Sequence, residues 1–293
     1  MANKEQPWHS LLAGATAGAV EGFVTYPTEF VKTTSQFGGQ RQKPLEIVRT
    51  TLQTKGITGL YSGASALIVG NAAKAGVRFL TYDTLKGMLA DKDGKVTAPR
   101  SLAAGLGAGV MESIFAVTPS ETIKTKMIQD SRRPNPQYKG LIHGTRSIIA
   151  EEGIFGIYRG LFPVMMRQGA NSAVRFTTYT TLKQFVQGNT RPGQTLPSSI
   201  TFAIGGMAGL VTVYATMPLD VVKTRMQSLD ARTQYRNSFH CIYRTFTEEG
   251  ITRFWRGTTP RLVRLVISGG VTFSVYEVCL SFHLFTALWD RIN

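Results

Sequence analysis

The distribution of apolar and polar residues predicts six long helices. Six segments of spanning length are apolar on most faces and keep their charged residues on one stripe, at 10–36, 64–90, 101–129, 160–187, 198–227 and 257–285. No segment holds the run of 18 uncharged apolar residues that marks a simple membrane span. A charge inside a membrane must face protein or water. The pattern therefore indicates a bundle of membrane helices around a water-filled cavity.

Short phrases recur three times along the chain. The sequence reads Pro-Thr-Glu-Phe-Val-Lys at 27–32, Pro-Ser-Glu-Thr-Ile-Lys at 119–124 and Pro-Leu-Asp-Val-Val-Lys at 218–223. A second phrase follows each one and centres on Gly56, Gly153 and Gly250, and a third contains Tyr82, Tyr179 and Tyr276. A repeat of this kind decides the architecture. The sequence predicts one domain over 1–293 built from the repeats 8–90, 99–187 and 198–286, with short amphipathic helices near 44–54, 139–151 and 236–249.

These phrases resemble the mitochondrial carrier family over nearly the whole chain. The family pattern is proline, an acid two residues on, a base three residues later and a second base two residues after that, followed after a gap by acid-glycine and aromatic-base-glycine. The chain departs from it at Thr34, Lys55 and Ser62. The resemblance implies an all-α, multi-pass protein of the mitochondrial inner membrane, with six transmembrane helices in three tandem pseudo-threefold repeats around a central cavity. It also implies a functional monomer whose short amphipathic helices lie on the matrix side and contact anionic lipid such as cardiolipin.

One register detail distinguishes the third long helix. Nine residues separate Gly18 from Pro27 and Gly209 from Pro218, whereas ten separate Gly109 from Pro119. A single inserted residue inside a helix usually forms a π-bulge. The spacing therefore predicts an irregular turn in the third helix that the first and fifth helices lack.

The proline phrases supply an ion-pair ring of three acids and three bases: Glu29, Lys32, Glu121, Lys124, Asp220 and Lys223. The resemblance implies a matrix gate in which each acid pairs with the base of a neighbouring repeat, as Glu29–Lys124, Glu121–Lys223 and Asp220–Lys32. Ordinary surface ion pairs, which stabilise little, are the alternative. The threefold recurrence beside a helix-bending proline favours the gate. The family's glutamine braces match Gln36 and Gln227, whereas Ile128 occupies that position in the second repeat.

The second, fourth and sixth long helices are the even helices of the three repeats, and the first, third and fifth are the odd helices. The even helices carry a motif of aromatic, acid and base at their opposite, cytoplasmic ends. Its members are Tyr82, Asp83, Lys86, Tyr179, Lys183, Tyr276 and Glu277. Thr180 and Leu280 replace one acid and one base. The pairs Asp83–Lys183 and Glu277–Lys86 are then the two that can form. We expect this cytoplasmic gate to be weaker than the matrix gate.

The even helices predict the substrate site. Positions four residues apart share a helix face, and six cations lie on or near such faces at mid-membrane, namely Lys74, Arg78, Arg167, Arg175, Arg261 and Arg264. At about 3 kcal/mol each, six cations facing lipid would cost on the order of 18 kcal/mol, so they must line water. Only Glu21 and Glu112 are expected to oppose them. Asn171 shares the face of Arg167 and Arg175, and Gly70 is expected to leave room for a bound molecule.

Overall composition agrees with a polyanion as the partner. The chain has 33 Lys and Arg against 18 Asp and Glu, a net charge of +15. The bases recur once per repeat and form no single tract, which argues against nucleic-acid binding. A basic adaptor of the membrane surface is a remote alternative, and alkaline extraction separates it from a six-span carrier. Neither the two cysteines, Cys241 and Cys279, nor the four histidines have the spacing of a catalytic or metal site. We therefore expect no enzyme activity, no metal and no cofactor.

Two stretches of the sequence indicate which class of anion is the substrate. Residues 70–79 and 167–176 are similar to the citrate (tricarboxylate) carriers of the family. This similarity implies an antiporter that exchanges citrate for malate or another di- or tricarboxylate by alternating access, with Arg167, Arg264 and Lys74 in direct contact with carboxylates. A carrier of oxoglutarate, malate or phosphate is the alternative. A nucleotide is disfavoured because Gly70, Asn171 and Ser268 are small and polar and offer no slot for a base.

Overall fold

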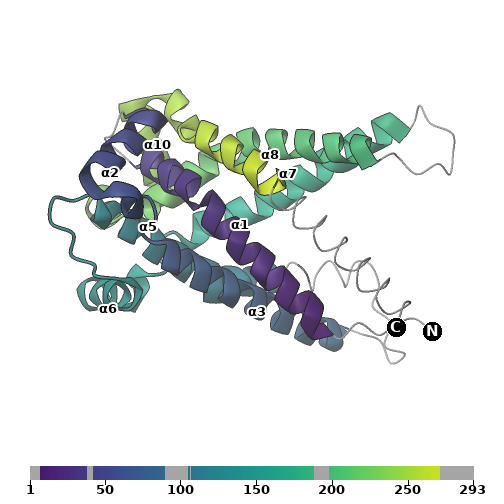
Figure 1. Ribbon diagram of the computed structural model, residues 1–293, viewed down its shortest axis with the longest axis horizontal. Coiled ribbons are helices and arrows are strands. Elements are labelled where there is room, and N and C mark those ends of the chain that lie inside the picture. Colours follow the sequence, from purple (N-terminus) through teal and green to yellow (C-terminus); the bar gives the residue numbers. More distant parts are fainter. Residues whose placement is uncertain (1–6, 38–41, 90–104, 106, 188–197, 271–293) are drawn as a thin grey trace, which may run out of the picture.

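The computed structural model describes residues 7–37, 42–89, 105, 107–187 and 198–270, which form helices and connecting loops. The long helices are α1 (Pro7–Gln36), α3 (Ala64–Leu89), α7 (Leu161–Gln187), α8 (Ser198–Met226), the unit of 107–112, η1 (Ser113–Val117) and α5 (Thr118–Ser131), and a helix over 258–270. The short helices are α2 (Pro44–Gly59), α6 (Leu141–Glu152), η2 (Ile154–Gly156), α9 (Ala231–Gln234), α10 (Ser238–Glu249) and η3 (Ile251–Trp255). Within the described residues a long, a short and a second long helix follow one another three times along the chain (Figure 1).

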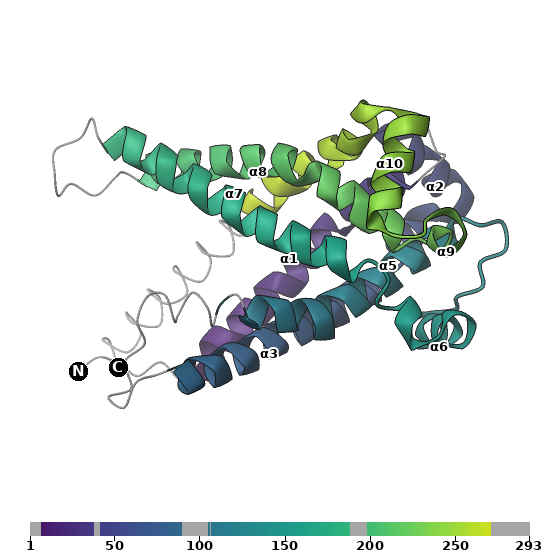
Figure 2. The same cartoon turned by 180° about the vertical axis from the view of Figure 1, so that it is seen from behind.

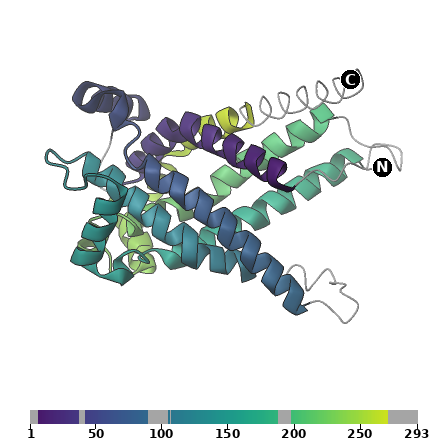
Figure 3. The same cartoon turned by 60° about the horizontal axis from the view of Figure 1, so that its bottom comes forward.

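The long helices converge at one end of the molecule and diverge toward the other. Figures 1 and 2 show α1, α5 and α8 meeting at the end that carries α2, α6 and α10, while α3 and the α7–α8 pair run apart from there. The same divergence is visible when the molecule is tilted (Figure 3). Of the described helices, only Ile200–Met226 is long and apolar enough to be recognised as a membrane span from composition alone. The charged stripes of the other long helices explain why hydropathy misses them.

Each short helix packs on the proline-containing helix of its own repeat. In the first repeat Ile47 of α2 lies in one buried cluster with Phe30 of α1. In the second, Ile148 of α6 packs with Ile123 of α5. In the third, Cys241 of α10 packs with Val222 of α8, and burial raises the pKa of the Cys241 thiol to about 11. Cys241 is therefore a small core residue.

A left-handed glycine begins each even helix. Gly63, Gly160 and Gly257 have φ values of 83°, 95° and 90°, which residues with a side chain rarely adopt. A Cβ on Gly63 would lie 3.2 Å from the Lys124 carbonyl oxygen, and one on Gly257 would lie 3.3 Å from that of Lys32. The start of each even helix thus rests on the backbone of a ring lysine in a neighbouring repeat.

The extra residue of the third helix forms a π-helix, as the spacing predicts. Residues Ser113–Val117 are π-helical, and the Thr118 amide donates to the Ser113 carbonyl five residues earlier. The corresponding parts of α1 and α8 are α-helical throughout. Because the wide turn absorbs one residue, Glu112 stays in the same register relative to Pro119 as Glu21 does relative to Pro27.

Deleting Phe115, an exposed residue of the π-turn, should be tolerated. The deletion should convert η1 into regular α-helix with the spacing of α1. The side chains on both sides of the deletion should therefore keep their present helix faces. Deleting Val24, an exposed residue of α1, should instead rotate the part of α1 that precedes it by about 100° relative to the part that follows it. We expect the Phe115 deletion to keep a thermal midpoint in detergent close to that of the parent protein and the Val24 deletion to lose it. Equal loss in both would contradict the bulge as a register device.

Candidate functional site

The three ion pairs that the sequence predicts are present where the long helices converge. Lys124 Nζ lies 2.8 Å from Glu29 Oε1, Lys223 Nζ lies 2.7 Å from Glu121 Oε2, and Lys32 Nζ lies 2.9 Å from Asp220 Oδ2. All six residues come from the kinked proline segments of α1, α5 and α8. The side chains are almost entirely buried, apart from Glu121, which is 19% exposed. The ring therefore closes this end of the bundle by joining all three repeats.

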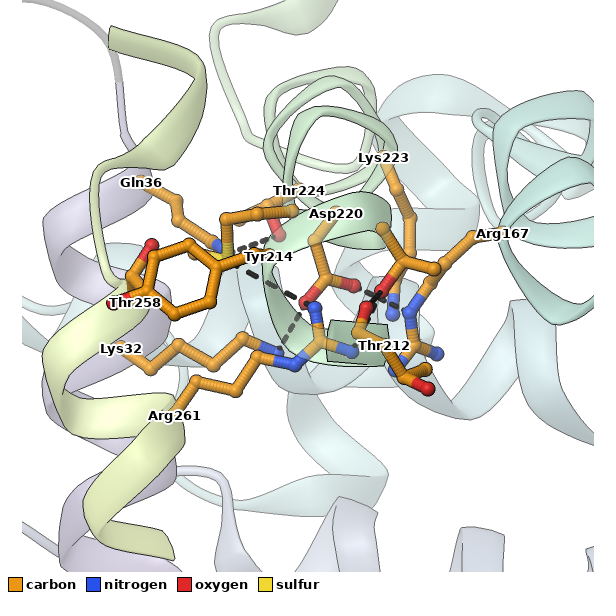
Figure 4. Close-up of polar contacts among 12 residues, drawn as sticks. Lys32, Gln36, Arg167, Thr212, Tyr214, Asp220, Lys223, Thr224, Thr258 and Arg261 are labelled. Carbon is orange, nitrogen blue, oxygen red and sulfur yellow. Dashed lines mark hydrogen bonds and ion pairs between the residues drawn. The ribbon is translucent and has the colours of Figure 1, made fainter. Parts of the chain in front are cut away.

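Asp220 is shared between several cations. Besides Lys32, it pairs with Arg261 at 3.0 Å and with Arg167 Nε (Figure 4). Its side chain has no exposed surface. Thr216 on α8 accepts a hydrogen bond of 3.0 Å from Arg261 Nη2 and so helps to hold that guanidinium against the ring.

Glu29, like Asp220, pairs with an arginine of the cavity in addition to its ring lysine. Arg264 Nη1 lies 2.5 Å from Glu29 Oε2, and Lys32 Nζ lies 3.9 Å from Glu29 Oε1. The prediction that only Glu21 and Glu112 oppose the cavity cations is therefore wrong. It treated ring and cavity as separate layers, whereas Arg167, Arg261 and Arg264 are long enough to reach the ring acids below them.

A cavity of about 260 Å³ lies directly above the ring. It is lined by four predicted arginines and their predicted neighbours: Arg167, Arg175, Arg261, Arg264, Asn171, Ser268 and Glu21. The guanidinium group of an arginine matches a carboxylate with two parallel hydrogen bonds. The arrangement can therefore bind a small molecule with several carboxylates.

Lys74 and Arg78 lie outside the lining of this cavity. Both reach Glu112, at 3.5 Å each, and Glu112 is almost completely buried. The expectation that Gly70 leaves room for a bound molecule is also wrong. A Cβ on Gly70 would lie 2.4 Å from Ser120 Cβ, because Gly70 allows α3 to pack closely against α5.

The glutamine positions are buried below the ring. Thr224 Oγ1 donates a 2.7 Å hydrogen bond to Gln36 Oε1, so that Gln36 links the first repeat to the third. The side chain of Gln227 has no hydrogen-bond partner among the described residues. Ile128 packs in the first-repeat cluster, and its neighbour Gln129 accepts a hydrogen bond from the Leu229 amide at 2.6 Å. Neither glutamine contacts a ring ion pair in the described part of the chain.

Sequence reasoning missed a second set of ion pairs. Lys126 contacts Glu152 at 2.5 Å, and Arg225 binds Glu249 with two hydrogen bonds of 2.5 and 3.0 Å. These residues are the second base of the proline phrase and the acid of the acid-glycine phrase. Each pair ties a loop helix to its own odd helix. The signal was available, because the first repeat loses both members together, at Thr34 and Lys55.

Lys55 has a different partner from the acid that it replaces. Its ammonium donates to the Ser131 carbonyl of the second repeat. The arginines of the aromatic-base-glycine phrase also cross between repeats, since Arg159 donates to the Tyr235 carbonyl at 2.9 Å and Arg256 to the Gln42 carbonyl at 2.7 Å. These contacts join neighbouring loops at the closed end.

The predicted cytoplasmic gate falls largely outside the described residues. Tyr276, Glu277, Thr272 and Leu280 lie beyond residue 270, and nothing is described of the side chains of Asp83 and Lys86. Tyr82 lies on α3, and Tyr179 and Lys183 lie on α7 at the end away from the ring. The pairs Asp83–Lys183 and Glu277–Lys86 stay predictions.

The sequence profile of the family described as "Mitochondrial carrier protein" matches residues 3–93, 94–190 and 194–285. The chain belongs to the mitochondrial carrier family. It is accordingly a multi-pass transporter of the mitochondrial inner membrane, not an enzyme.

Relatives across fungi and mammals cover most of this mitochondrial carrier. It is 50% identical over 284 residues, 94% of each chain, to "Mitochondrial tricarboxylate transporter 1" of Mycosarcoma maydis. It is 47% identical to "Tricarboxylate transport protein" of Saccharomyces cerevisiae, covering 94% of this chain and 95% of the relative. It is 40% identical to "Tricarboxylate transport protein, mitochondrial" of Homo sapiens, covering 92% and 88%.

Two double charge swaps are compared with their single reversals. Exchanging the charges of Glu121 and Lys223 should recover more of the stability lost in the single reversals than exchanging those of Glu29 and Lys124. Among the described residues, Glu121 is in ion-pair contact with Lys223 alone, whereas a lysine at 29 would face Arg264 and Lys32. Breaking a buried pair costs about 3–5 kcal/mol, so each single reversal should lower the thermal midpoint in detergent.

The double variants separate the pairs. E121K/K223E should recover most of the loss that its single reversals cause, and E29K/K124E should recover little. Equal recovery in both doubles would mean that Arg264 does not belong to the closed ring.

Proposed function

We propose that this carrier exchanges citrate for malate, or for another di- or tricarboxylate, across the mitochondrial inner membrane by alternating access. The observation that carries the proposal is the convergence of Arg167, Arg175, Arg261 and Arg264 on one cavity above a closed ring. The names of relatives that cover more than nine-tenths of this chain support a tricarboxylate as the substrate.

The charge of ring and cavity supports a polyanion. Seven cations face four carboxylates there, which leaves three positive charges, counting the three ring lysines, the four cavity arginines, the three ring acids and Glu21. Citrate carries three carboxylates and malate carries two, so either can compensate much of this excess. Arginine suits this task better than lysine because its planar group holds a carboxylate at two points.

The shared arginines suggest how binding is coupled to opening. In the closed ring, Arg167 and Arg261 bind Asp220, and Arg264 binds Glu29. A substrate carboxylate entering the cavity competes for the same guanidinium groups. Each arginine that turns to the substrate leaves a ring acid with one cation fewer, which weakens the matrix gate when the site is filled.

Another anion remains the second candidate. Oxoglutarate, malate alone or phosphate would also suit an arginine-lined cavity, and a panel of labelled substrates in proteoliposomes separates these possibilities. Whichever anion is carried, Lys74 can bind it only if the ion pair between Lys74 and Glu112 breaks.

The surroundings of the carrier are part of the proposal. A monomer suffices because one chain encloses the cavity, and nucleic acid plays no role. An anionic lipid such as cardiolipin at the matrix helices is supported by the exposed aromatic residues Phe239, Tyr243 and Phe246 on α10, of which Tyr243 lines one surface pocket with the bases Arg232 and Arg236.

Replacing Arg175 with Ala should raise the KM for citrate roughly tenfold or more and leave the thermal midpoint unchanged. Arg175 lines the cavity but makes no ion pair with a described residue, so its loss removes a contact to the substrate and none to the ring. Arg167→Ala should abolish exchange and also change the midpoint, because Asp220 loses a partner. The measurement is uptake of labelled citrate into liposomes loaded with malate.

Matched variants complete this test. Arg175→Lys should recover little, since an ammonium cannot reproduce the fork. Arg146→Ala, which removes an exposed arginine of α6 outside the cavity, should behave like the parent protein. Unchanged citrate uptake by the Arg175→Ala variant would remove this arginine from the site, and absence of citrate uptake by the parent protein would overturn the proposed function.

A further inference from the structure

Among the five acids predicted for the ion-pair ring and the cavity, one differs from the others. Glu29, Glu112, Glu121 and Asp220 each lie within ion-pair distance of at least one cation. Glu21 has no ion pair with any described residue, although it lines the same cavity as four arginines. The one side-chain hydrogen bond that it makes to a described residue comes from Ser268 Oγ to Glu21 Oε1.

We propose that Glu21 recognises the hydroxyl group of the substrate and so selects hydroxy acids from acids of the same charge. This inference rests on the proposed function and deepens it. The second oxygen, Oε2, has no partner among the described residues, and it is the atom that would accept the hydroxyl hydrogen.

The chemistry of a carboxylate explains why a hydroxyl is the matching group. An ionised carboxylate only accepts hydrogen bonds, so its ligand must be a donor. Fully ionised citrate or malate has one donor, the hydroxyl on the carbon next to a carboxylate. All other polar atoms of these substrates are anionic oxygens, which Glu21 repels. A negative charge in an anion site weakens binding of every carboxylate, and only a donor on the substrate offsets that loss.

The positions of Glu21 and Arg175 agree with one bound pose. Glu21 projects from α1 and Arg175 from α7, and both line the cavity. Arg175 is the cavity arginine that no described acid occupies. A hydroxy acid presents a hydroxyl and a carboxylate on the same carbon, so it can contact both residues together. Ser268 fixes the rotamer of Glu21 from the helix over 258–270.

Pairs of substrates that differ only in the hydroxyl test the inference. Tricarballylate has the three carboxylates and the carbon chain of citrate without the hydroxyl, and succinate stands in the same relation to malate. Uptake of each labelled acid is measured in proteoliposomes for the parent protein and for Glu21→Ala, Glu21→Gln and Thr25→Val. Thr25 lies one turn further along α1, outside the cavity lining, and its hydroxyl donates to the Glu21 main-chain carbonyl.

We expect the parent protein to prefer citrate over tricarballylate roughly ten- to hundredfold in kcat/KM, the range for a hydrogen bond to a charged group. In the Glu21→Ala variant this ratio should fall close to one. Uptake of citrate should drop while that of tricarballylate rises, because the repulsion is also removed. A merely structural role would lower both. Glu21→Gln should lie between, and Thr25→Val should keep the parent ratio.

The outcomes separate this inference from the proposed function. Transport of citrate and tricarballylate at equal efficiency by the parent protein, with no change of ratio in Glu21→Ala, would overturn the role of Glu21 and leave citrate transport intact. The role of Glu21 would also be overturned if the two substrates of a pair are transported equally well but the uptake of both changes with pH. Glu21 would then act by accepting a proton from a substrate carboxyl group. If the parent protein takes up none of the four acids, the proposed function itself fails.

Discussion

The buried carboxylate of Asp220 is the interaction on which the rest of the closed state depends. Three cations from three helices meet it, and its side chain has no exposed surface. A buried charge is stable only when it is fully paired, because water no longer solvates it. Lys32 of α1 therefore stays near α8, and Arg167 and Arg261 reach from the cavity lining to Asp220 in the ring. Ring, cavity and helix convergence are consequences of satisfying this one acid and its counterparts Glu29 and Glu121.

Much of this arrangement could be predicted from the residues alone. The threefold phrases indicate the six-helix order and the three ring pairs, because pairing rules follow from a motif that recurs in register. The spacing between Gly109 and Pro119 predicts the π-turn, since a helix can absorb one residue only by widening. The four cavity arginines were also found, because positions four apart share a face.

Contacts between layers could not be predicted in this way. Which acid an arginine reaches depends on its rotamer and on the depth of the neighbouring helix, so the contacts of Arg264 with Glu29 and of Arg167 with Asp220 have no signature in the spacing. Gly70 shows the same limit. A small residue on a cavity face indicates either open space or a close helix crossing, and only the position of Ser120 decides between them.

The bond from Lys55 to the Ser131 carbonyl has a consequence for how the chain assembles in the bilayer. In the second and third repeats the loop helix is clamped to its own odd helix by Lys126–Glu152 and Arg225–Glu249, contacts that form within one repeat. The first repeat lacks that clamp and borrows an acceptor from its successor. The final geometry of its loop therefore depends on the following repeat, through a contact that cannot form before Ser131 is in place.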